Sequence, residues 1–159
     1  TYSAQNWGIH SLDRLRRGQK ASVLVTCIYA VIIYGVVLLL LPFETGLFFS
    51  GDVSEVIGYV RIYISICGLF FIPLGLIFIY RNLLQGCGYV LIPTLGGVVE
   101  LISRGIFAFA AAQSHSFTGV CIANASAWCS AGIFLWIAYL FIMKGLIRKD
   151  QEKKQKAVS

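Results

Sequence analysis

The feature that most constrains this chain is a series of long apolar runs with few or no charged residues. The first, Ala21–Leu41, contains no charged residue and ends at Pro42. A run of this length suits one helical crossing of a hydrocarbon layer about 30 Å thick. Further runs cover about residues 53–80, 90–112 and 118–143. The sequence therefore predicts an all-α integral membrane protein with four transmembrane helices.

The composition agrees with this fold class. Apolar residues make up 58% of the 159 positions and charged residues only 13%, whereas a soluble domain is nearer half apolar and a quarter charged. The net charge of +6 comes mainly from two basic segments that flank apolar runs, Arg14–Lys20 and Lys144–Lys156. Because basic flanks mark the cytoplasmic side of membrane helices, we expect membrane lipids as partners and no nucleic acid.

The placement of charge also predicts a topology. Residues 1–20 are expected to form the end of a preceding helix and a basic cytoplasmic loop, and residues 144–159 a basic cytoplasmic tail. Four crossings return the chain to the side where it began, so both basic segments share one face of the membrane. The chain opens with Thr1 and not Met, and we expect the residues upstream to belong to a longer protein.

The second predicted span contains Pro73 near its middle. Proline has no backbone N–H and crowds the carbonyl four residues earlier, so it kinks a helix and leaves a carbonyl that needs another partner. The kink is either a mechanical hinge or a packing device.

The third predicted span carries two charged residues in its interior, Glu100 and Arg104. At about 1.5 Å of rise per residue, Glu100 lies about 15 Å beyond Val90, near the middle of the bilayer. The two residues are four apart and therefore share a helix face. One interpretation is the polar lining of a central cavity, where Glu100 exchanges protons or meets a cationic substrate. The other is a buried ion pair that fixes helix packing.

The fourth predicted span repeats a small residue every four positions, at Ala123, Ala127 and Ala131, with Gly132 beside them. Such a strip allows close approach of another helix. Asn124 lies next to the strip, roughly 10 Å inside the outer boundary. It is a candidate substrate contact, although hydrogen bonding between helices is the more common role of such a residue.

Enzyme signatures are missing from the sequence, which has no HExxH, GxSxG or P-loop motif. The two histidines, His10 and His115, fall on opposite sides of the membrane in this topology. The five cysteines show no CxxC spacing and fit small packing residues. We expect no enzymatic activity, no metal site and no cofactor.

Two segments resemble a known family. The first is TYSAQNWGIHSLDRLRRG, an AQN-x-G run followed by a basic stretch; the second is YRNLLQGCG, followed by a proline and VVELISRG. In these segments the chain resembles the C-terminal part of the multidrug and toxic compound extrusion (MATE) transporters. The resemblance covers essentially the whole chain.

The resemblance implies that the four spans correspond to helices nine to twelve of a twelve-helix, two-lobed antiporter, as part of its second six-helix bundle. It implies a cytoplasmic turn motif at Arg81, Asn82, Gln85 and Gly86. It also implies export of small organic molecules, often cationic, in exchange for Na+ or H+. Helices one to eight are then the missing partners of this chain, and the expected location is the plasma (inner) membrane of a bacterial cell.

Departures from the family pattern leave alternatives open. Some members place an acidic cation ligand in the tenth helix, but no acidic residue lies between Arg61 and Arg81 here, which shifts weight to Glu100 or to the missing half. One alternative is a flippase for lipid-linked saccharides of the same superfamily, although such cavities carry several arginines and only Arg104 is deep here. Another is a small four-span membrane scaffold.

Overall fold

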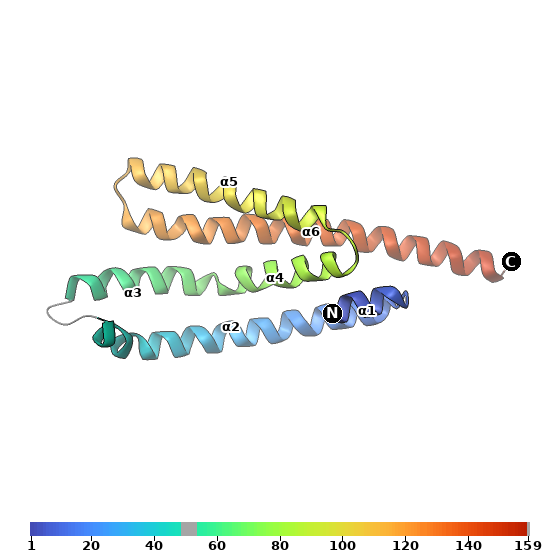
Figure 1. Cartoon of the computed structure of the whole chain (residues 1–159), viewed down its shortest axis with the longest axis horizontal. Coiled ribbons are helices and arrows are strands. Elements are labelled where there is room, and N and C mark those ends of the chain that lie inside the picture. Colours follow the sequence, from blue (N-terminus) through green and yellow to red (C-terminus); the bar gives the residue numbers. More distant parts are fainter. Residues whose placement is uncertain (49–53, 159) are drawn as a thin grey trace.

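The computed structural model describes residues 1–48 and 54–158, and this part of the chain is helical apart from short turns. Six helices follow one another: α1 (Tyr2–Gly8), α2 (Leu12–Phe48), α3 (Ser54–Leu69), α4 (Phe71–Gly86), α5 (Leu91–Gln113) and α6 (Phe117–Val158). The long helices lie side by side, and α1, the start of α2 and the C-terminal part of α6 lie toward the same end (Figure 1). The predicted all-α class is confirmed for these residues.

Three helices are long and apolar enough to cross a membrane: Leu12–Leu41 within α2, α5, and Phe117–Glu152 within α6. The bent pair α3–α4 makes a fourth if it counts as one span. Many large apolar side chains on the outside of the bundle are exposed, among them Leu39, Leu91 and Phe141. An apolar exterior of this extent suits lipid better than water, so the fold is consistent with a multi-pass membrane protein.

The predicted kink at Pro73 is confirmed, and it divides the second span into two helices inclined by 48°. Pro73 has no N–H to offer the carbonyl of Leu69, four residues earlier, and its ring crowds that carbonyl. Helix α3 accordingly ends at Leu69. The next N–H, that of Phe70, instead bonds the carbonyl of Cys67 at 3.0 Å.

Several helices continue beyond the apolar runs that the sequence predicted as spans. Residues 12–20, predicted as a basic loop, form the start of α2, where Asp13 stands in the first turn and interacts favourably with the helix dipole. Helix α2 also continues through Pro42 to Phe48, and α6 continues through the basic tail to Val158. The predicted start of the second span near residue 53 lies outside the described residues.

Three helices end in the same type of turn. The residue after the cap is left-handed in each: His10 after α1 (φ 55°), Gly88 after α4 (φ 86°) and His115 after α5 (φ 48°). The N–H that follows it bonds the carbonyl five residues earlier, at 2.9–3.2 Å. This pattern satisfies carbonyls that a helix end leaves without partners. Both histidines therefore lie at chain reversals between helices.

The strip of small residues predicted on the fourth span is buried in the bundle. Ala127 and Ala131 are fully covered, and Ala123 is nearly so. A Cβ added at Gly132 would lie 3.5 Å from the backbone carbonyl oxygen of Pro73. Close approach of α6 to the neighbouring backbone is therefore confirmed, as small residues in membrane helices allow.

The contact between α5 and α6 depends on a glycine and a pair of serines. A Cβ added at Gly96 would lie 3.0 Å from the side chain of Leu135, which is itself fully buried. Ser103 Oγ and Ser130 Oγ are 3.0 Å apart across the same interface and share a hydrogen bond. The two helices thus pack closely and are joined by a polar contact that fixes their register.

All five cysteines are free thiols. Cys67, Cys87 and Cys121 are buried. At the turn between α4 and α5, burial raises the pKa of the Cys87 thiol, so less reactive thiolate forms at neutral pH. These three cysteines pack as small apolar side chains.

We predict that Gly96→Val loosens the α5–α6 contact, whereas Gly97→Val does not. A side chain at Gly96 must displace Leu135, and overpacking of this kind costs about 1–3 kcal/mol. A Cβ at Gly97 meets no atom within 4 Å, and valine has the same effect on helix propensity at both positions. Thermal unfolding in detergent measures the difference, and equal melting temperatures for the two variants would contradict the packing described here.

Candidate functional site

The charged residues of the third span lie at the boundary between α4 and α5. Arg104 Nη2 donates a hydrogen bond of 2.8 Å to Glu100 Oε1, one turn apart on α5, as their spacing predicts. A second contact comes from α4, where Arg81 Nη2 lies 3.6 Å from Glu100 Oε2. One carboxylate therefore lies between two guanidinium groups that belong to different helices. We call Arg81, Glu100 and Arg104 the charged cluster.

The position of Arg81 differs from the prediction. The resemblance placed Arg81, Asn82, Gln85 and Gly86 in a cytoplasmic turn, but all four belong to the last turns of α4, and the turn itself covers residues 87–90. Arg81 lies about 7 Å along the helix from its C-terminal end. From there its long side chain reaches Glu100, as arginine stems can extend along apolar surface.

The charged cluster has an excess of one positive charge, with two bases and one acid. Its side chains are partly covered, with exposed fractions of 29% for Arg81, 21% for Glu100 and 42% for Arg104. Arg81 Nε, Arg81 Nη2 and Arg104 Nε are buried and have no hydrogen-bond partner among the described residues. Unsatisfied buried donors are destabilising, so the cluster can accept a further polar or anionic group.

Asn124, the third candidate from the sequence, does not join the charged cluster. Its side chain interacts with the hydroxyl of Tyr63 on α3, next to Cys67. Glu100, by contrast, contacts Arg81 on α4. The contact between α6 and α3 favours the interpretation of Asn124 as a link between helices.

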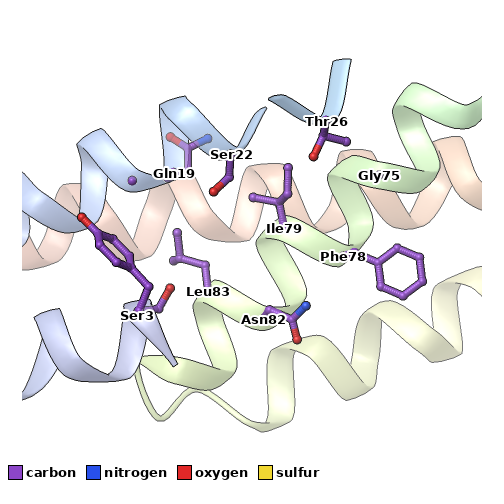
Figure 2. Close-up of a pocket in the computed structure, with 11 residues that line it drawn as sticks. Ser3, Gln19, Ser22, Thr26, Gly75, Phe78, Ile79, Asn82 and Leu83 are labelled. Carbon is purple, nitrogen blue, oxygen red and sulfur yellow. The ribbon is translucent and has the colours of Figure 1, made fainter. Parts of the chain in front are cut away.

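A polar cavity lies on the other side of α4, between α1, α2 and α4. Its volume is about 530 Å³, and Figure 2 shows α2 and α4 facing each other across it. The lining mixes hydroxyl, amide and apolar groups, including Ser3, Gln19, Ser22, Thr26, Ile79 and Asn82. Asn82 follows Arg81 directly in the sequence, so consecutive residues of α4 serve the cavity and the charged cluster.

The two segments that carry the family resemblance contact each other at one end of this cavity. A Cβ added at Gly86 would lie 2.8 Å from Ser3 Cβ and 3.1 Å from the backbone nitrogen of Ala4. Gly86 therefore allows α1 to rest directly on the end of α4. Asn6 of the AQN-x-G run is buried, and its amide donates a 2.9 Å hydrogen bond to the Tyr2 carbonyl.

Comparisons of the chain with protein-family models, curated proteins and solved structures find no match. In residues 1–48 and 54–158 no group of three or more His, Cys, Asp or Glu side chains is arranged to hold a metal ion. The fold and the site define a class: a helical protein with several apolar helices that could span a membrane and a charged cluster between two of them.

We predict that Glu100 is coupled more strongly to Arg81 than to Arg104 when the bundle unfolds, although the Arg81 contact is longer. Membrane helices unfolded in SDS remain largely helical, so the Glu100–Arg104 pair persists and adds about 0.2–0.5 kcal/mol at most. The Arg81 contact between helices is lost and contributes about 1 kcal/mol.

Double-mutant cycles with Glu100→Gln, Arg81→Gln and Arg104→Gln measure both coupling energies in SDS titrations. The Glu100–Arg104 cycle is the control, because it probes the same carboxylate within one helix. A larger coupling energy for Arg104 than for Arg81 would contradict the prediction.

Proposed function

We propose that this chain is part of a secondary active efflux transporter that resembles the MATE family. The observation that supports the proposal best is the charged cluster, in which Glu100 on a candidate span lies between Arg81 and Arg104. Ionisable groups inside membrane helices are rare and costly, and they mark substrate or ion pathways. The resemblance assigns the four spans to helices nine to twelve, within the second six-helix bundle.

The orientation follows from the basic residues. Arg16 and Lys20 on α2 lie near Lys144 and Arg148 on α6, at one end of the bundle. The positive-inside rule assigns such an end to the cytoplasm. With this orientation the C-terminus lies inside the cell, and the resemblance to the MATE family implies the plasma membrane of a bacterial cell.

The bend at Pro73 and the charged cluster suit alternating access. Arg81 is on α4, on the C-terminal side of the bend, whereas Glu100 and Arg104 are both on α5. A swing of α4 about the bend separates Arg81 from Glu100 and leaves the Arg104 contact in place. The site on α5 then changes from a net charge of +1 to zero, which favours entry of a cation at Glu100.

In this scheme Na+ or H+ competes with an organic cation for Glu100, and the competition couples the two fluxes. The cavity between α1, α2 and α4, of about 530 Å³, lies on the other side of α4 from Glu100 and is a separate partly apolar space. This volume falls in the range of small-molecule sites, about 300–1,000 Å³. Export of small organic cations by antiport is the function proposed.

One observation favours a second candidate, a flippase for lipid-linked saccharides. Among the described residues, Arg81 Nε and Arg104 Nε form no hydrogen bond, and Arg81 Nη2 has only the 3.6 Å ion-pair contact with Glu100. Guanidinium groups bind phosphate oxygens in well-matched geometry. Arg81 adds a second arginine next to Glu100, beside the Arg104 that the sequence indicated.

Transport assays on the whole protein encoded by the gene of this chain distinguish the two candidate functions. For a cation exporter, Glu100→Gln should reduce uptake of a cationic dye into inverted vesicles by about tenfold or more, the effect of losing roughly 1.4 kcal/mol of binding. Arg81→Gln should leave dye affinity unchanged or raise it, because it removes a repelling charge.

For a flippase we expect the larger loss of transport from the Arg81 variant and the smaller loss from the Glu100 variant. Arg81→Gln then abolishes transfer of a diphosphate-linked lipid, and Glu100→Gln preserves it. Arg17→Gln serves as the control, because Arg17 is exposed on α2 and belongs neither to the charged cluster nor to the cavity. Unchanged transport of both substrates by both cluster variants would remove the charged cluster from the mechanism.

A further inference from the structure

A basic groove that contains no residue of the charged cluster lies between α2, α4 and α6, and it shares Gln19 with the polar cavity. Its volume is about 760 Å³. Four cationic side chains line it, Arg16 and Lys20 from α2 and Lys144 and Arg148 from α6, and no carboxylate does. We call this the basic groove. It lies toward the end of the bundle where α2 begins and α6 continues into the tail (Figure 1).

Among the residues that the structure describes, one of these four cationic side chains forms an ion pair. Arg148 forms an ion pair with Glu152 at 2.9 Å, and both side chains are largely exposed. Within the described part of the chain, no salt bridge is found for Arg16, Lys20 or Lys144. Three like charges in one groove repel one another, so a bound anion stabilises them.

The floor of the basic groove is polar and ordered by hydrogen bonds. Gln19 donates to the Tyr80 hydroxyl at 3.3 Å and accepts from the Tyr139 hydroxyl at 3.4 Å. The two tyrosine rings lie 5.1 Å apart. Arg16 is close enough to Tyr139 to interact with it electrostatically. Gln19 on α2, Tyr80 on α4 and Tyr139 on α6 therefore form one polar surface in the basic groove. We call the four cationic side chains that line the same groove the cationic rim.

The other half of the basic groove is apolar. Trp136, Leu140 and Met143 line it along α6, within the apolar run that covers about residues 118–143. The distance along α6 from Trp136 to Arg148 is about 18 Å by helical rise. Lys20 precedes the first apolar run and Lys144 follows the last, so the cationic rim lies at the predicted membrane surface and the apolar half within the bilayer.

We propose that the basic groove binds an acidic membrane phospholipid. The phosphate lies among Arg16, Lys20 and Lys144, and an acyl chain lies along Trp136 and Leu140. This arrangement matches both parts of such a lipid, whereas a soluble anion uses only the cationic rim. Basic pockets between membrane helices bind anionic head groups in this way. The proposal rests neither on the proposed transport reaction nor on the role of the charged cluster.

A binding experiment on the purified chain in zwitterionic detergent tests the proposal. Phosphatidylglycerol and phosphatidylcholine that carry the same fluorescent acyl chain are titrated separately. We expect phosphatidylglycerol to bind at least about tenfold more tightly. Arg16→Gln/Lys20→Gln should weaken its binding by about thirtyfold, from the attraction that two basic side chains provide near a membrane surface.

The matched control is Arg14→Gln/Arg17→Gln. It removes the same charge from the same end of α2, from exposed side chains that do not line the basic groove. We expect its affinity for phosphatidylglycerol to stay within about twofold of the original chain, because no groove contact is lost. Should the groove variant fail to fold, Lys144→Gln on α6 replaces it, with an expected loss of about fivefold.

Three outcomes would overturn the proposal. Equal losses in the groove and control variants would show general attraction to surface charge. Full displacement of phosphatidylglycerol by millimolar inorganic phosphate would show a site for soluble anions. Equal affinity for the two lipids would show that the basic groove does not select an acidic head group. None of these measurements depends on transport, so they leave the proposed function untouched.

Discussion

A carboxylate among apolar helices is stable only when it is paired with cationic groups. In this protein the Glu100 carboxylate on α5 is paired with Arg81 on α4, and this contact joins the two helices. Helix α5 packs mainly on α6 and only lightly on α4. The contact from Arg81 to Glu100 is therefore one of few polar links across the α4–α5 boundary. Since breaking a partly buried ion pair leaves an uncompensated charge, Glu100 constrains where the last turns of α4 can lie.

Helix α4 connects the functional features of the bundle. Arg81 belongs to the charged cluster, Asn82 lines the polar cavity, and Tyr80 lies on the floor of the basic groove. These three residues are consecutive, and the turn of an α-helix directs them to different neighbours. The bend at Pro73 precedes all three. A change in the bend angle therefore moves all three sites together.

The sequence predicted the apolar spans well because length and hydropathy decide whether a helix suits a membrane. It also predicted the kink at Pro73, the Glu100–Arg104 pair and the small-residue strip around Ala127, since each follows from local spacing. It missed the contact of Arg81 with Glu100, because only the docking of α4 on α5 determines which faces meet. Helix boundaries were missed where polar segments stayed helical, as before Ala21, because hydropathy marks the membrane edge and not the end of a helix.

Helix α6 extends without interruption from Phe117 to Val158, over 42 residues and about 63 Å. No proline occurs along it, so its inner and outer parts form one continuous rod. The N-terminal part of α6 packs against α5 and α4 through the small-residue strip. The C-terminal part projects from the bundle (Figure 1). Because the backbone hydrogen bonding of α6 is continuous, a displacement of its projecting end would tilt the end that packs against α4 and α5.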